Sequence, residues 1–450
     1  MWIAARFAGE AGASRDPSST MNTIGTADIF HAPHLGRAFG EALRQATGAD
    51  AQPIEAWADA LLADAIRERA SDIHLDSHES GVRVRFRIDG TVHQVASLAP
   101  ERGLRLLRYF KVRSNLDPAP SLLPEDARFD VELPGKSLDI RVACAPCVFG
   151  DKLALRLLQR SNVSLRLADL GLRVDDRARI QDWLGDISGM FVVAGPVGSG
   201  KTTTIYALLA ELRLSQRNVV TIEDPVEYQL EQINQIEVNT RRGLTFAEGL
   251  HSALRLDPDY ILLGEIRDEE SALTAMEAAA TGRVVLTTMH GRNAAGVITT
   301  LRSLRVPDYE IAASVAFIVG QRLVRKLCLH CRKPEAPTQT ERRWLESLRE
   351  KVPDKVWHAI GCERCGQTGY FERTGVFELL PVDEQVYDLI LAGKDEHALR
   401  QHVRDTGVRL LLQDGLAKAV EGITDLTELS RMGAQSYLDR AQPARMKTTN

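Results

Sequence analysis

The chain has 450 residues, of which 44% are hydrophobic and 26% are charged, and it carries a formal net charge of −5 with a pI near 6.2. It is long enough for about three domains with buried cores, and its acidic balance excludes a general positive field that would attract nucleic acid or anionic lipid. The apolar stretches 189–197 and 260–264 are far shorter than the ~20 residues of a membrane span, and the N-terminus has no signal-peptide pattern. We therefore expect a cytoplasmic protein that does not bind nucleic acid directly.

The two ends of the chain carry little pattern. Alanine, glycine, serine and arginine dominate residues 1–52, where Met21 offers a second possible start. We expect this segment to be a flexible arm and residues 441–450 to be a frayed tail.

A small α+β domain is expected over residues 53–160. The patterns predict helices over 53–69 and 101–113, and strands over 82–88, 129–133 and 138–143. In the first strand, apolar residues alternate with arginines up to an Asp-Gly turn, which is typical of a half-buried hairpin. The helix 101–113 carries basic residues near one face, which either form a solvated surface or contact acidic partners or lipid head groups. Residues 161–175 are expected to be a linker.

Strands and helices alternate between residues 176 and 321. The patterns predict strands over 190–194, 218–222, 260–264 and 284–288, and helices over 175–186, 201–213, 245–256, 269–280 and two more up to about 321. Strands of valine, isoleucine and leucine that alternate with helices indicate a mainly parallel sheet, with ligands at the carboxyl ends of its strands. The expected fold class is therefore α/β.

Residues 195–202 fit the phosphate-loop pattern, and they follow a predicted strand and precede a predicted helix. Glycines let the backbone N–H groups turn toward phosphate oxygens, and the helix N-terminus adds a favourable dipole. Lys201 is expected to reach the β and γ phosphates of ATP, and Thr202 to hold Mg²⁺. The alternative is a glycine-rich turn without a ligand. The predicted nucleotide contacts are Gly195, Pro196, Val197, Gly198, Ser199, Gly200, Lys201, Thr202 and Thr203.

Acidic residues follow two other predicted strands. Glu223 and Asp224 follow one strand, and Glu265 follows another. In a parallel sheet these strand ends lie beside the phosphate loop, where a carboxylate can hold the magnesium water shell or orient the attacking water. Acidic residues at strand ends also cap helices, so each cluster alone is ambiguous. His290 ends a third strand and is a candidate sensor of the γ-phosphate.

Two C-x-x-C pairs lie in the region 322–440, which is otherwise expected to be helical. Four thiolates complete the tetrahedral shell of a structural Zn²⁺ site, and the alternative is four unrelated buried thiols. The predicted zinc ligands are Cys328, Cys331, Cys362 and Cys365. A third pair, Cys144 and Cys147, has no partner pair and is expected to consist of buried small apolar side chains.

The motifs of the chain follow one another in a specific order. They are Ser71–His74, Val84–Gly90, the loop 195–202, Thr221–Tyr228, Gly243–Phe246, Leu254–Asp259, Gly264–Asp268 and Thr281–His290. In this order they resemble the secretion ATPase superfamily, and most closely its type II secretion and type IV pilus assembly ATPases. The resemblance covers about residues 55–430. It implies a RecA-like ATPase core at 176–321, a PAS-like N-terminal domain and a hexameric ring.

The resemblance also implies roles for individual residues. Glu223 would lie in the family's Asp box and position the attacking water, while Glu265 would lie in an atypical Walker B motif and serve magnesium or catalysis. His290 would close the His box. The N-terminal domain would supply Arg128 and Arg141 to the nucleotide, where an arginine neutralises developing phosphate charge.

Together with these features, the resemblance implies a homohexameric ATPase that is bound peripherally to the inner membrane through a platform protein. It would use ATP, with Mg²⁺ and a structural Zn²⁺, to drive assembly of a type IV pilus or a type II secretion pseudopilus. The tetracysteine element favours export, because retraction motors of the resembled family typically lack it. The alternatives are a pilus retraction, DNA-uptake or conjugation motor, a non-hydrolysing nucleotide-dependent scaffold, and a nucleic-acid translocase, which the acidic charge disfavours.

Overall fold

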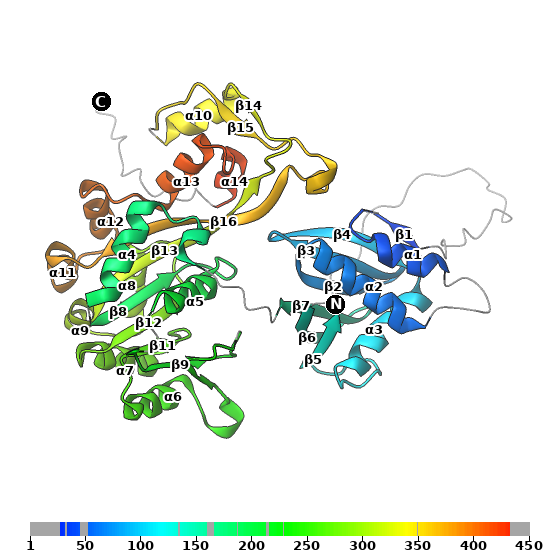
Figure 1. Ribbon diagram of the computed structural model, residues 1–450, viewed down its shortest axis with the longest axis horizontal. Coiled ribbons are helices and arrows are strands. Elements are labelled where there is room, and N and C mark those ends of the chain that lie inside the picture. The colour runs from blue at the N-terminus through cyan, green and yellow to red at the C-terminus, as the bar shows by residue number, and fades with distance from the viewer. Residues whose placement is uncertain are drawn as a thin grey trace, which may run out of the picture. The chain divides into compact units, whose positions relative to one another are not determined.

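The computed structural model describes residues 28–31, 34–45, 53–133, 136–159, 166–186, 188–212, 216–227, 229–348 and 350–432. The chain divides into two compact units, whose elements are labelled in Figure 1. The N-terminal unit comprises the described parts of Met1–Ile88, Val92–Phe129 and Ile140–Leu157, and the C-terminal unit those of Asp89–Thr91, Asp130–Asp139 and Leu158–Asn450. The predicted domain boundaries near 160, 176 and 321 stay predictions, and the predicted tail 441–450 lies outside the described residues.

The N-terminal unit contains a seven-stranded sheet in the order β1-β4-β3-β2-β7-β6-β5. Its strands are β1 (Ile29–Phe30), β2 (Ala70–His78), β3 (Gly81–Ile88), β4 (Thr91–Leu98), β5 (Glu125–Leu133), β6 (Lys136–Cys147) and β7 (Gly150–Gln159), and its helices are α1 (Arg37–Gln45), α2 (Ile54–Arg67) and α3 (Pro100–Arg113). Helix α3 packs against β3 and α2 against β2. In β3, Val82, Val84 and Phe86 are buried, so the predicted alternation of this strand is confirmed.

Part of the segment that we expected to be a flexible arm is folded. Strand β1 pairs with β4, and helix α1 packs against α2. The buried carboxylate of Asp64 accepts hydrogen bonds from the backbone N–H groups of Ala38 (3.2 Å) and Phe39 (2.8 Å) in the first turn of α1. Because these partners come from later parts of the chain, no local pattern within residues 1–52 predicts them. Residues 1–27, 32–33 and 46–52 lie outside the described part of the chain.

The C-terminal unit contains a second seven-stranded sheet, in the order β10-β9-β11-β12-β8-β13-β16. Its strands are β8 (Gly189–Ala194), β9 (Val219–Glu223), β10 (Asn234–Glu237), β11 (Tyr260–Leu263), β12 (Val284–Met289), β13 (Val315–Leu327) and β16 (Tyr370–Pro381). All ladders from β10 to β13 are parallel, and β16 pairs antiparallel with β13. The predicted α/β fold class is confirmed, and the carboxyl ends of β8, β9, β11 and β12 lie at the same end of the sheet.

Helices cover both faces of this sheet (Figure 1). They are α4 (Val174–Asp186), α5 (Lys201–Glu211), α6 (Phe246–Ala253), α7 (Glu269–Ala280), α8 (Ala295–Ser303), α9 (Asp308–Ser314), α11 (Glu384–Leu391) and α12 (Glu396–Asp405). On one face of the sheet, α4 and α5 share a core with Phe191 and Val193. On the other face, the core contains Met190 and Val192 together with residues of α6, α7, α8, α9, α11 and α12. Strand β8 therefore alternates between two cores, which explains why its sequence is apolar throughout.

The prediction of helix up to residue 321 is wrong for residues 315–321, which belong to strand β13. This strand lies between β8 and β16, and its Phe317 ring stacks on Phe191 with centroids 5.2 Å apart. Most of the segment is buried from both faces, so it shows an apolar run without a strand period. Such runs do not distinguish a buried strand from a buried helix.

The last region combines short strands and helices with the long strand β16. Strand β14 (Lys333–Glu335) pairs with β15 (Val356–His358), and the helices are α10 (Gln339–Ser347), α13 (Leu411–Val420) and α14 (Leu426–Arg431). Short 3-10 helices cover Leu167–Leu170, Thr240–Arg242, Leu254–Leu256 and Glu363–Cys365. Within the residues that the structure describes, no helix is both long enough and apolar enough to cross a bilayer.

Candidate functional site

The phosphate loop connects β8 to α5, as its sequence predicts. Gly198 and Gly200 have φ angles of 76° and 85°, a left-handed conformation that side chains with a Cβ atom rarely adopt. Gly200 is the N-cap of α5 and offers no side chain to the first N–H groups of that helix. These backbone donors therefore remain available to an anion at the helix N-terminus.

Lys201 folds back over the loop. Its Nζ atom donates to the carbonyl oxygens of Gly195 (2.9 Å) and Pro196 (3.2 Å). Burial lowers the pKa of Lys201, the charge of Arg322 lowers it further, and the charge of Glu265 opposes both. A half-buried ammonium group that is bonded to neutral carbonyls is suited to pair with a more strongly charged ligand, such as a phosphate.

The start of the loop is closely packed against Ser199 and against strand β13. The Ser199 hydroxyl is buried and has no hydrogen-bond partner among the described residues. A Cβ atom at Gly195 would lie 2.3 Å from the Ser199 Oγ atom and 2.5 Å from the Gln321 carbonyl oxygen, so only glycine fits there. Thr202 and Thr203 are half-buried in the first turn of α5, while the Val197 side chain is 83% exposed at the rim.

Glu223 is buried at the end of β9, and its carboxylate is held by three donors. The hydroxyl groups of Tyr206 and Thr221 donate to it at 2.5 and 2.6 Å, and the Gln235 Nε2 atom donates at 3.1 Å. Two of these bonds reach Oε1 and one reaches Oε2, which leaves Oε2 able to accept one more. The sequence interpretation did not include Tyr206, although its position four residues after Thr202 places it on the same face of a helix.

Glu265 follows β11 and lies in a charged cluster with Arg267 and His290. Arg267 donates to Glu265 Oε1, and its Nη1 atom lies 3.5 Å from Asp224 Oδ2. The His290 Nε2 atom lies 3.6 Å from Glu265 Oε2. The structure thus brings Glu265, His290 and the Asp224 segment together at the carboxyl ends of neighbouring strands. The ladder that pairs Met289 with Ala194 places His290 next to the start of the phosphate loop.

Arg128 and Arg141 belong to the N-terminal unit. Arg128 is exposed on β5, and Arg141 is half-buried on the adjacent strand β6. Their delivery to the nucleotide therefore stays a prediction.

The four predicted zinc ligands form one cluster, in which all sulfur atoms lie within 4.8 Å of one another. The Cys328–Cys362 and Cys331–Cys365 Sγ distances are both 3.9 Å, and that of Cys362–Cys365 is 3.7 Å. Tetrahedral coordination with Zn–S bonds of about 2.3 Å requires sulfur separations of about 3.8 Å, whereas a disulfide requires about 2.05 Å.

Backbone groups surround the same cluster. The N–H groups of Gly361, Cys362 and Gly369 donate to the sulfurs of Cys331 or Cys365 at 3.2 to 3.4 Å. These donors favour thiolates, which is the form in which cysteine binds zinc. The residues therefore fit Zn²⁺, and Cys328, Cys331, Cys362 and Cys365 would hold it.

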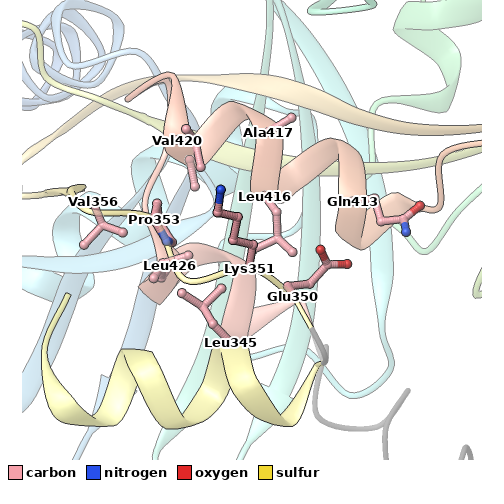
Figure 2. Close-up of a pocket in the computed structure, with 11 residues that line it drawn as sticks. Leu345, Glu350, Lys351, Pro353, Val356, Gln413, Leu416, Ala417, Val420 and Leu426 are labelled. Carbon is pink, nitrogen blue, oxygen red and sulfur yellow. The ribbon is translucent and has the colours of Figure 1, made fainter.

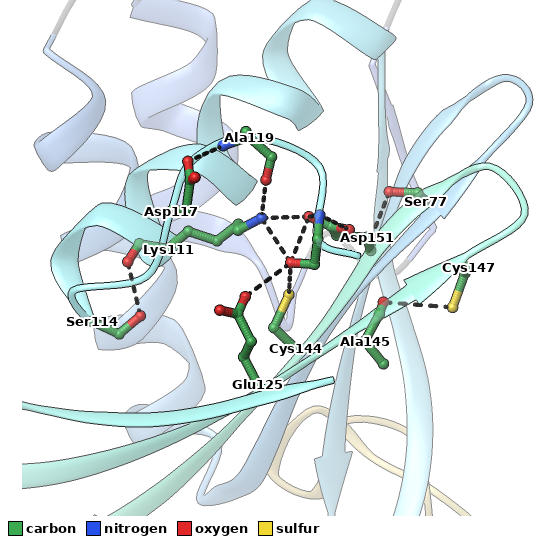
Figure 3. A network of polar contacts seen from close by, with 11 residues as sticks. Ser77, Lys111, Ser114, Asp117, Ala119, Glu125, Cys144, Ala145, Cys147 and Asp151 are labelled. Carbon is green, nitrogen blue, oxygen red and sulfur yellow. Dashed lines mark hydrogen bonds and ion pairs between the residues drawn. The ribbon is translucent and has the colours of Figure 1, made fainter. Parts of the chain in front are cut away.

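The third cysteine pair is only partly as predicted. Cys144 is buried, but Cys147 is exposed. Both belong to β6, where residues three apart face opposite sides of the strand. Cys144 lies beside a buried polar network in which the Lys111 ammonium group contacts Asp151 at 2.6 Å and Ser121 at 3.0 Å (Figure 3).

A pocket of about 200 Å³ lies in the C-terminal unit, between the segment after α10 and helix α13. Figure 2 shows the lining side chains, which include Leu345, Leu416 and Leu426 as well as the charged Glu350 and Lys351. None of the residues that line it is a predicted site residue, so the pocket is separate from the phosphate loop.

Similar proteins were found by sequence and by structure. The type II/IV secretion system protein family matches residues 47–431. Type II secretion system protein E of Aeromonas hydrophila is 40% identical over 386 residues, which are 85% of this chain and 76% of that protein. Type II secretion system ATPase E of Vibrio cholerae is 39% identical over 389 residues, which are 86% of this chain and 76% of that protein.

Solved structures agree on the fold. The ATPase DotB of Legionella pneumophila is 21% identical, with a TM-score of 0.62, and the match covers 84% of this chain and 95% of that one. The pilus retraction motor PilT with bound ADP is 24% identical, with a TM-score of 0.56, over 84% of this chain and 98% of that one. The chain therefore belongs to the type II/IV secretion system protein family, and it is an ATPase of that family.

Proposed function

We propose that this protein is a homohexameric motor that hydrolyses ATP to drive assembly of a type II secretion pseudopilus or a type IV pilus. The observation that carries the proposal is the contact of Glu265 with His290 at the same end of the parallel sheet at which Lys201 lies in the phosphate loop. The motor would lie at the cytoplasmic face of the inner membrane, bound there through a platform protein.

The geometry suggests how the residues would act. Lys201 would exchange its two carbonyl contacts for phosphate oxygens, and the loop N–H groups would hold the rest of the polyphosphate. Thr202 and the Glu265 segment would hold Mg²⁺, which supplies neutralisation of phosphate charge. Glu223 would orient the attacking water through its remaining acceptor site, while Tyr206, Thr221 and Gln235 keep the carboxylate in place.

Two groups would complete the reaction. His290, which lies within reach of Glu265, would respond to the γ-phosphate, and Arg128 and Arg141 would supply positive charge when the ring closes. The resemblance associates a tetracysteine element with export rather than retraction, and the cysteine cluster is consistent with such an element. The relatives from Aeromonas hydrophila and Vibrio cholerae are both named as type II secretion proteins.

ATP turnover by the full-length protein tests the assigned site. We expect Lys201→Ala to reduce kcat/KM by about 100-fold or more, because it removes a charge that contacts the transferred phosphate. Lys355→Ala is a matched control, since Lys355 is an exposed lysine of the C-terminal unit outside the predicted site. Equal turnover by Lys201→Ala and the wild type would refute the site.

A second experiment tests the biological role. The Glu265→Gln variant, which should bind ATP and hydrolyse it slowly, is tagged and purified from gently solubilised native membranes. Recovery of a polytopic membrane protein with pilin-like subunits supports assembly or export. Recovery of conjugation or DNA-uptake components supports the alternative motor.

A further inference from the structure

Strand β13 contacts the phosphate loop through Gln321, a buried residue outside all the predicted motifs. The ladder pairs Gly320 with Ala194, so the residue after Gly320 lies alongside the start of the loop. The Gln321 Nε2 atom donates to the Ser199 carbonyl oxygen at 2.9 Å, and its Oε1 atom accepts from the Thr204 hydroxyl at 2.7 Å. One amide group therefore joins the tip of the loop to the first turn of α5.

The close packing around Gln321 makes this contact specific. A Cβ atom at Gly200 would lie 3.0 Å from the Gln321 Nε2 atom. One at Gly195 would lie 2.5 Å from the backbone carbonyl oxygen of Gln321. Both glycines thus allow β13 to approach the loop. The contact needs a donor and an acceptor on the same side chain, and among side chains of this length and neutral charge glutamine offers both.

Arg322 extends from the opposite face of the strand, as adjacent strand residues do. Its Nη1 atom donates to the Gly291 carbonyl oxygen at 3.3 Å, and its Nη2 atom donates to that of Arg292 at 2.6 Å. These carbonyls directly follow His290. A Cβ atom at Gly291 would lie 3.3 Å from the Ala194 side chain, so this segment also packs against the residue that precedes the phosphate loop.

We infer that Gln321 and Arg322 are positioning residues of the nucleotide site, and that β13 uses them to hold the phosphate loop and the His290 segment at a fixed distance from each other. The inference rests on the proposed function, because it gives these two segments the task of binding and sensing ATP. Both residues act through backbone groups of the site. Neither needs to contact the nucleotide.

The contact of Gln321 with Thr204 is tested by a double-mutant cycle on the full-length protein. Gln321→Leu removes both amide contacts, and Thr204→Val removes the hydroxyl at constant shape. We expect Gln321→Leu to weaken ADP binding by about 10-fold, as expected for two lost hydrogen bonds, and Thr204→Val to weaken it less. Added to Gln321→Leu, the Thr204→Val change should have no further effect. Fully additive effects, or unchanged ADP affinity in Gln321→Leu, would overturn the inference.

A milder variant covers the possibility that Gln321→Leu does not fold. Gln321→Glu keeps the acceptor for Thr204 but loses the donor to the Ser199 carbonyl oxygen, so it should weaken ADP binding while retaining the Thr204 coupling. Wild-type ADP affinity in Gln321→Glu would overturn the role of the Ser199 contact. Lys326→Gln is the control on the same strand, because the Lys326 ammonium group forms a partly exposed ion pair with Glu372.

Arg322 is tested by comparing Arg322→Lys with Arg322→Gln. A lysine keeps the charge but cannot span two carbonyl oxygens with a planar fork, so a bridging role predicts that both variants lose about 10-fold in kcat with little change in KM. Restoration of kcat by Arg322→Lys alone would show that only the charge matters and would overturn the bridging role. Unchanged kcat in both variants would do the same.

Failure of this inference differs from failure of the proposed function. If Lys201→Ala loses activity but the Gln321 and Arg322 variants behave as the wild type, the site is correct and the positioning role is wrong. If Lys201→Ala retains full activity, the site assignment itself is wrong, and the positioning role falls with it.

Discussion

The Sγ atoms of Cys328 and Cys362 lie 3.9 Å apart, although one residue directly follows β13 and the other precedes β16 by several residues. Together with Cys331 and Cys365, they would tie the loops at the ends of these paired strands to a single ion. The cluster therefore lies at the carboxyl end of β13, the strand that also passes the start of the phosphate loop.

We expect about one zinc ion per chain in freshly purified, unchelated protein. Cys362→Ser should lose most of this metal and lower the Tm, because the folded state then lacks the free energy of metal binding. Metal analysis and thermal unfolding check both effects. Cys147→Ser is the control, since this exposed cysteine lies outside the cluster. Metal-free wild-type protein would contradict the prediction.

The two cysteines of β6 should differ in reactivity. Cys147 is exposed, whereas Cys144 is buried, and burial raises the pKa of its thiol. A thiol reacts with maleimide through its thiolate, so we expect rapid labelling of Cys147 and slow labelling of Cys144 in the native protein. Peptide mass spectrometry after timed labelling measures both rates, with Cys147→Ser as the control. Equal rates, or a disulfide between the two after mild oxidation, would contradict the opposite orientations.

Lys111 should be essential to the stability of the N-terminal unit. Its ammonium group is 1% exposed and contacts Asp151, Ser121 and the Ala119 carbonyl oxygen (Figure 3). Removing one partner of a buried ion pair leaves the other charge without compensation, so Lys111→Met should cost about 3–5 kcal/mol. Hydrogen exchange in peptides that cover residues 117–125 and 150–159 should become faster.

Lys152→Met is the matched control for this prediction. Lys152 also pairs with an aspartate, Asp76, at 3.0 Å, but its side chain is 42% exposed, and such pairs contribute less than about 1 kcal/mol. Hydrogen exchange in β2, which carries Asp76, should therefore stay at the wild-type rate in Lys152→Met. Equal effects of the two substitutions would show that burial of the Lys111 pair is not the cause.

The sequence predicts the parts of the site that depend on local pattern. The glycines and Lys201 of the phosphate loop, and the acidic residues and His290 at strand ends, have fixed positions relative to strands that are recognisable from their apolar runs. The cysteine cluster is predictable for the same reason, since its spacing alone indicates a metal. Contacts between distant segments are not encoded in this way.

Gln321 and Tyr206 contact the candidate site, but no sequence motif identifies them. Gln321 lies in an apolar run that favours helix and strand equally, and only its place between β8 and β16 brings it to Ser199. Tyr206 resembles any apolar residue of a core helix until Glu223 from another strand is brought against its hydroxyl. The folded segment around α1 depends likewise on Asp64 of α2.

The pair formed by Arg325 and Glu428 should make stability depend on pH. The Arg325 Nη2 atom lies 2.6 Å from Glu428 Oε1, and both side chains are about nine-tenths buried. Burial raises the pKa of Glu428, but the hydrogen bonds and charge of Arg325 outweigh it, so the pKa lies below its ordinary value of 4.5. A depressed pKa contributes stability above the unfolded-state pKa, and this contribution is lost as the pH falls through the folded-state pKa.

We therefore expect Glu428→Gln to destabilise the protein by about 2 kcal/mol near neutral pH, and the difference from the wild type to shrink below about pH 4.5. Thermal unfolding of both proteins at a series of pH values gives this difference directly. Glu372→Gln is the control, because the Glu372 side chain is 50% exposed in its pair with Lys326 and should produce a small effect. A difference that stays constant down to about pH 3 would mean that folding does not shift the pKa of Glu428, and a wild-type protein that gains stability relative to Glu428→Gln as the pH falls would mean that burial outweighs the contact with Arg325.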